Sequence, residues 1–87
     1  MDFHWDWGCN TLFEPGHGCS DLLPPAGSIV QILHSPHFPY QVTWLGAARS
    51  TTQDFKGLQP ATYDTFDVAV AAVEATVRAA GHTVGGV

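Results

Sequence analysis

The spacing of apolar residues near the end of the chain is the clearest structural signal in the sequence. Five apolar residues recur there at intervals of three or four positions: Phe66, Val70, Val73, Val77 and Ala80. This period places them on one face of an α-helix, with the charged residues of the segment on the opposite side. The pattern predicts an amphipathic helix over 65–80 that packs its apolar face against the rest of the domain.

Residues at both ends of this segment suit the termini of a helix. Asp64 is expected to cap the N-terminus, with Asp67 three positions further on, where an acidic side chain favours the positive end of the helix dipole. Gly81 supplies a residue that readily adopts the left-handed backbone conformation found where helices end. Glu74 and Arg78 are spaced as an i,i+4 ion pair on the exposed side.

Segments upstream of the helix have the composition of strands. Residues 28–34 are rich in β-branched and apolar side chains between proline-containing turns, which is typical of a largely buried strand. Residues 40–45 alternate between apolar and polar side chains, so we expect a strand with one packed face. The two segments are expected to pair as a hairpin around 35–39. A further strand is expected over 48–55, where threonine and serine are frequent.

The beginning of the chain also alternates. Phe3, Trp5 and Trp7 are separated by polar residues, which predicts a short edge or N-terminal strand. Residues 8–27 carry turn-forming residues throughout, and residues 85–87 are expected to form a frayed tail.

These elements predict a single α+β domain over 1–87. It comprises a loop-rich N-terminal segment (1–27), a strand-rich segment (28–55) and the helix (65–80). We expect a small antiparallel sheet of three to four strands with the C-terminal helix packed on one face, because each element must bury its apolar side against another.

Composition and charge exclude several partners. The chain is 45% hydrophobic and 13% charged, which is too apolar for a disordered tail. Its formal net charge of −5 would repel a phosphate backbone, so nucleic acid is not expected as a partner. No segment has the length of a transmembrane helix, and the first residues lack the basic region of a secretory signal. We therefore expect no membrane partner and a cytoplasmic location.

The two cysteines leave three chemical states open. In a reducing compartment Cys9 and Cys19 are expected to remain thiols, and in an oxidising one they would close a short loop. Together with His17 they supply the ligand types that zinc takes, although the spacing differs from that of common zinc sites. A zinc-binding domain using Cys9, His17 and Cys19 is therefore one alternative function. A small thiol-dependent enzyme is a second alternative.

Aromatic residues are concentrated in a part of the chain without basic side chains. The first 48 residues hold all three tryptophans and no lysine or arginine. Trp5, Trp7 and Phe13 suit the aromatic anchors of a protein–protein interface. Large aromatic residues also build the cores of small proteins, so for Trp5 and Trp7 both interpretations stay open.

The sequence lacks the motifs that would indicate catalysis. It contains no nucleophile elbow, phosphate-cradling loop or metalloprotease helix, so we expect neither an enzyme nor a cofactor. We expect a non-enzymatic protein–protein interaction module, a small acidic regulator or inhibitor of a larger protein or complex, of the kind that phages encode. The expected contacts are Trp5, Trp7 and Phe13, and self-association into a homo-oligomer is compatible with the same features.

Overall fold

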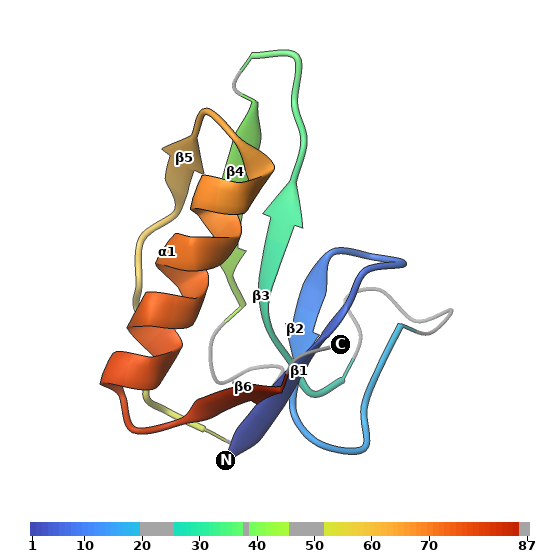
Figure 1. The fold of residues 1–87 in the computed structure, drawn as a ribbon, viewed down its shortest axis with the longest axis vertical. Coiled ribbons are helices and arrows are strands. Elements are labelled where there is room, and N and C mark those ends of the chain that lie inside the picture. Colours follow the sequence, from blue (N-terminus) through green and yellow to red (C-terminus); the bar gives the residue numbers. More distant parts are fainter. Residues whose placement is uncertain (20–25, 38, 46–51, 86–87) are drawn as a thin grey trace.

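The described part of the chain folds into one sheet and one helix (Figure 1). The computed structural model describes residues 1–19, 26–37, 39–45 and 52–85. The elements are, in order, β1 (Asp2–Asp6), β2 (Thr11–Phe13), β3 (Ser28–Leu33), β4 (Tyr40–Trp44), β5 (Ala61–Tyr63), α1 (Phe66–Ala79) and β6 (Thr83–Gly85). The fold is of the α+β class, as the sequence predicts.

The sheet is larger than predicted and it is mixed. Its strands lie in the order β5-β4-β3-β2-β1-β6. The first five strands form an antiparallel meander, and β6 returns after the helix to pair parallel with β1. The expectation of three to four antiparallel strands therefore missed β2, β5 and β6. Each of these has three residues, too few to show the alternation by which strands are identified in a sequence.

Helix α1 crosses one face of the sheet from edge to edge. It contacts β4, β5 and β6, and Figure 1 shows its first turn beside β5 and its last turn leading into β6. Ala69, Val73 and Val77 form its buried side, in agreement with the predicted orientation. Ala80 is exposed instead of buried, because the helix ends at Ala79.

The start of α1 is capped by a different residue from the one predicted. Thr65, in an extended conformation, accepts a hydrogen bond from the Val68 backbone N–H at 3.2 Å through its hydroxyl oxygen. Asp64, the predicted cap, lies one position too early for this bond. At the other end Gly81 has a φ of 91°, which confirms the predicted helix stop. The described part of the chain contains no helix with the length and apolar character that crossing a bilayer requires.

The hydrophobic core fills the space between the sheet and α1. Strand pairing aligns apolar residues on the face toward the helix, since Trp5 pairs with Leu12 and Leu12 pairs with Val30. The buried core comprises Phe3, Trp5, Leu12, Ile29, Val30, Ile32, Val42, Phe55, Ala69, Val73 and Val77. Burying a large apolar side chain stabilises a fold by about 1.5 to 3 kcal/mol, so this cluster is the main stabilising feature.

The strand predicted over 48–55 is not found in residues 52–55, and residues 48–51 lie outside the described residues. The described part instead enters a turn that buries Phe55, which is 1% exposed and stacks on Trp44 at 5.2 Å. The physical reason is that this part of the chain closes a tight turn, in which the Lys56 backbone N–H donates to the Gln53 carbonyl at 3.1 Å. The prediction of a frayed tail over 85–87 is wrong for Gly85, because this residue belongs to β6 and pairs with His4.

A polar contact joins the 52–58 turn to the start of β6. The Nε2 atom of His82 donates a hydrogen bond to the Asp54 carboxylate, and the His82 ring lies against Phe3 and Phe55. Hydrogen bonds from His82 and then Thr52 lower the pKa of the Asp54 carboxyl from its ordinary value of 3.8. The contact therefore stabilises the fold above about pH 4, and its contribution is lost as the pH falls through the lower folded-state pKa.

Helix orientation can be tested with one charge placed on each side of α1. Val73→Asp puts a carboxylate where the side chain is 1% exposed, and we expect a loss of at least about 4 kcal/mol or complete unfolding. Val68→Asp is the matched control, because Val68 is 52% exposed in the first helical turn, and it should change stability by less than about 0.5 kcal/mol. Thermal unfolding followed by circular dichroism measures both. Equal melting temperatures for the two variants would contradict the orientation.

Candidate functional site

The turn between β1 and β2 positions most of the residues that the sequence singles out. Asp6 ends β1, and its carboxylate accepts a hydrogen bond from the Gly8 backbone N–H at 3.0 Å. The Cys9 backbone N–H donates to the Asp6 carbonyl at 3.3 Å, and Asn10 has a φ of 49°. Asparagine tolerates this left-handed conformation better than most residues, which is why the chain can reverse so tightly here.

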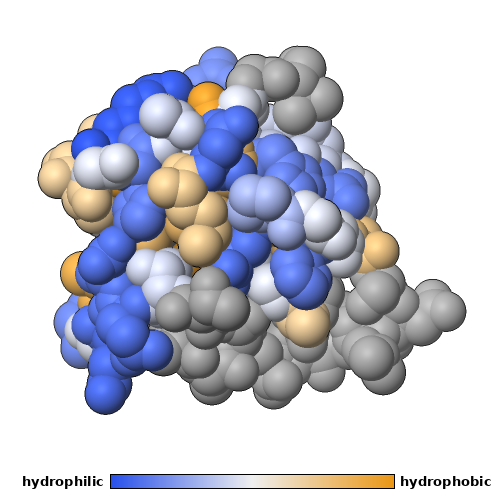
Figure 2. All heavy atoms as spheres, turned by 90° about the horizontal axis from the view of Figure 1, so that it is seen from below, coloured by the Kyte–Doolittle hydropathy of each residue, from blue (hydrophilic) through white to orange (hydrophobic). Residues whose placement is uncertain are grey.

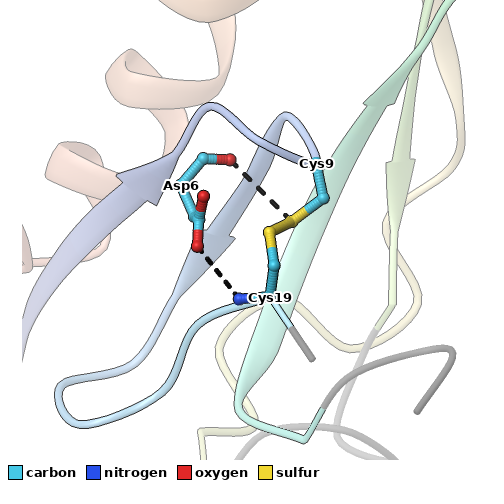
Figure 3. A group of neighbouring side chains, drawn as sticks. All are labelled: Asp6, Cys9 and Cys19. Carbon is cyan, nitrogen blue, oxygen red and sulfur yellow. Dashed lines mark hydrogen bonds between the residues drawn. A yellow bond between two sulfur atoms is a disulfide. The ribbon is translucent and has the colours of Figure 1, made fainter. Parts of the chain in front are cut away.

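A disulfide joins this turn to the segment after β2. Cys9 is bonded to Cys19, so the structure corrects the first expectation that both cysteines remain thiols. Figure 3 shows Asp6 beside the bridge, where its carboxylate accepts a second hydrogen bond from the Cys19 backbone N–H at 3.0 Å. The hydrogen bonds from Cys19 and then Gly8 lower the pKa of Asp6. Asp6 thus holds both ends of the disulfide-closed loop.

The predicted metal ligands are only partly brought together. Cys9 and Cys19 share a group with Asp6, with ligand atoms within 4.8 Å of one another, and His17 is not part of it. The ring of His17 instead packs over Gly27, where an added Cβ would lie 2.3 Å from the ring. In the oxidised state the two sulfur atoms are bonded to each other and are not the thiolates that zinc binds. The zinc interpretation therefore requires reduction of the bridge, with Asp6 as a ligand that sequence reasoning missed.

Two of the three predicted binding residues lie in the interior. Trp5 is 4% exposed, and its indole N–H donates to the Glu74 carboxylate at 3.1 Å. Phe13 is fully buried and its ring stacks on that of His4. Their rings are not available to a partner in the folded protein. The alternation of the first residues predicts that Trp5 and Trp7 share a side, but it does not distinguish which of the two is covered.

Trp7 is the predicted binding residue that remains at the surface. It is 43% exposed, yet its ring stacks on Trp5 with the centroids 4.8 Å apart and the planes 11° from parallel. Its ring also contacts Phe66 in the first turn of α1, edge to face at 5.6 Å. Trp7 is therefore exposed and held in place at the same time.

The ring contacts continue from Trp7 across three other elements. Phe66 contacts Tyr40 at the start of β4 at 5.6 Å, and Tyr40 contacts His34 after β3 at 5.2 Å. We refer to these four residues, Trp7, Phe66, Tyr40 and His34, as the aromatic surface. Trp7 and His34 are exposed, whereas Phe66 and Tyr40 are half-buried against the core. The sequence analysis did not predict the other three as binding residues, because Phe66 falls on the apolar face of the predicted helix and Tyr40 and His34 fall in predicted strands. The available signal was that Phe66, Tyr40 and His34 all lie at the ends of predicted elements.

The aromatic surface has acidic neighbours. Asp67 is exposed beside Phe66, and Glu74 lies two turns further along the same side of α1, bonded to Trp5. The expected ion pair is present, with Arg78 3.3 Å from the Glu74 carboxylate. The described residues enclose no pocket. The opposite end of the molecule, seen from below in Figure 2, is mainly hydrophilic where it is coloured, with apolar residues in separate patches.

The disulfide can be tested by removing it in two ways. Replacing both cysteines, Cys9→Ser with Cys19→Ser, should leave a folded protein whose free energy of unfolding is lower by about 2.5 to 3 kcal/mol, because the bridge closes a ten-residue loop. Urea unfolding of the wild type with a reductant should show the same loss, and the double variant should not respond to the reductant. Identical stability of all samples would mean that the two sulfur atoms are not bonded.

Similarity to known proteins does not indicate a function for this chain. Comparison of the chain with protein families, with curated proteins and with solved structures finds no match. The function is therefore inferred from the residues and contacts of the chain itself.

Proposed function

We propose that this chain is a non-enzymatic protein–protein interaction module, a small acidic regulator or inhibitor of a larger protein or complex. Its contact region is the aromatic surface, with Trp7 at the centre of the interaction. The observation that carries the proposal is that Trp7 keeps 43% of its surface exposed while it is held between Trp5 and Phe66. A large ring left half in water has an apolar face available for a partner.

The packing beneath Trp7 favours binding. Trp5 is buried in the core and anchored to Glu74, so the ring against which Trp7 stacks is itself fixed. Binding costs conformational entropy when side chains must be ordered at the interface, and a pre-ordered aromatic anchor lowers that cost. Exposed, well-supported tryptophan and tyrosine are enriched among the residues that dominate binding energy at interfaces.

The two alternatives from the sequence both need free thiols. A zinc site would use the sulfur atoms of Cys9 and Cys19 as ligands, and a thiol enzyme would use one of them as a nucleophile. Both atoms are committed to the disulfide, whereas the aromatic surface is available without any chemical change. The geometry therefore supports the interaction function better than either alternative.

The proposal predicts that Trp7→Ala separates binding from stability. The variant should stay folded, with a melting temperature within a few degrees of the wild type, because the ring is half-exposed. It should lose about 2 kcal/mol or more of affinity for its partner, measured as retention of proteins from cell extract and as the concentration dependence of self-association. Leu58→Ala is the matched control, because Leu58 is 39% exposed in the 52–58 turn and should bind as the wild type does.

Trp5→Ala provides the opposite reference. It removes a core side chain, so it should cost about 3 to 5 kcal/mol of stability and impair binding only through unfolding. If Trp7→Ala shows that same large stability loss with no specific binding defect, Trp7 is a core residue and the interaction proposal fails.

A further inference from the structure

We propose that the partner segment that docks on the aromatic surface is cationic and carries arginine. This inference rests on the proposed interaction function and specifies the chemistry of the partner. It is drawn from the shape of the surface, from the electrostatics of its rings and from the acidic residues around it.

The shape of the surface fits an extended segment. Four rings follow one another with centroid distances of 5.6, 5.6 and 5.2 Å from Trp7 through Phe66 and Tyr40 to His34. No pocket interrupts them among the described residues, so a small molecule would find nothing that encloses it. A chain in extended conformation advances about 3.3 Å per residue, so each step from one ring to the next corresponds to roughly two residues of such a chain.

The charges at this surface favour a cation. The face of an aromatic ring attracts positive charge, and Trp is the strongest of the aromatic side chains in this respect. Asp64 and Asp67 are exposed on either side of Phe66 in the sequence. Glu74 lies on the same side of α1 as Asp67, and its contact with Trp5 places it next to the ring that supports Trp7. The carboxylates of Asp64 and Asp67 thus flank Phe66 in the sequence, and Phe66 contacts Trp7.

The described part of the chain does not supply the matching cations. Its lysine and arginine side chains are Lys56 and Arg78, and Arg78 is paired with Glu74. Asp67 and Asp64 form no ion pair with a described residue, and Asp67 faces water at the positive end of the helix dipole. A partner that brings its own positive charge can therefore pair with these two carboxylates.

Arginine suits this surface better than lysine. Its guanidinium group is planar, stacks on aromatic faces and bonds carboxylates with two parallel N–H groups. A second copy of this chain is a poor occupant, because each copy has a formal net charge of −5 and would bring acidic residues against acidic residues. Electrostatic complementarity therefore selects a basic segment of a different protein.

The test uses synthetic eight-residue peptides that alternate glycine with arginine, lysine or glutamate, each carrying a fluorescent label. We expect the arginine peptide to bind the whole protein in an anisotropy titration, the lysine peptide to bind several-fold more weakly, and the glutamate peptide not to bind. Binding should weaken as the salt concentration rises from 50 to 300 mM, because exposed charge pairs are screened.

Variants locate the binding on the aromatic surface. Trp7→Ala should lower the affinity for the arginine peptide about tenfold, and Asp67→Asn should lower it about three- to fivefold. Asp2→Asn is the matched control, because it removes the same charge at the far end of β1 and should leave binding unchanged. Circular dichroism of each variant establishes that it is folded.

Three results would overturn the inference. The first is that the arginine and glutamate peptides bind equally well, or that neither binds. The second is that Trp7→Ala leaves binding of the arginine peptide unchanged. The third is that the protein associates with itself and Trp7→Ala abolishes this self-association. The outcomes for the cationic partner and for the proposed function can be told apart. If the arginine peptide does not bind but Trp7→Ala still loses a partner from cell extract, only the cationic chemistry is wrong. If Trp7→Ala changes neither the binding of the arginine peptide nor the retention of proteins from cell extract, both proposals are wrong.

Discussion

The burial of the Trp5 ring between the sheet and α1 is the contact on which the rest of the structure depends. Its ring occupies the core opposite Leu12, and its indole N–H reaches Glu74 on the helix. A buried indole N–H without an acceptor would cost about 1 to 3 kcal/mol, so the position of Glu74 helps to fix α1 against the sheet. The same ring stacks against Trp7 and supports it. One residue therefore links the stability of the core to the geometry of the proposed binding surface.

The parts of the fold that could be predicted are those with a repeating pattern. The helix shows several turns of apolar spacing, and β3 and β4 show runs of β-branched or alternating residues, so all three were identified. β2, β5 and β6 are three-residue strands that exist because a neighbouring strand offers free backbone groups. The helix cap was placed one residue early, because Asp64 and Thr65 are both good caps and the sequence does not show which one adopts the extended conformation.

The candidate site was predicted less well, for a related reason. The sequence predicted Trp7 and Trp5 together as binding residues and could not separate them, since two residues on one side of a strand look alike until the position of the helix is known. Phe66, Tyr40 and His34 are far apart in the chain and meet through the tertiary fold. The pairing of Cys9 with Cys19 likewise depends on the β1–β2 turn, which brings Cys9 next to the segment after β2.

The most direct test of this account is hydrogen exchange and relaxation at the indole N–H groups of protein labelled with nitrogen-15. Because Trp5 is buried and bonded to Glu74, its indole N–H should exchange slowly, by at least about two orders of magnitude relative to a free indole. The indole of Trp7 should exchange rapidly while its relaxation shows the restricted motion of an ordered ring. Rapid exchange at Trp5, or a freely mobile Trp7 ring, would contradict the claim that a buried tryptophan holds an exposed one ready for binding.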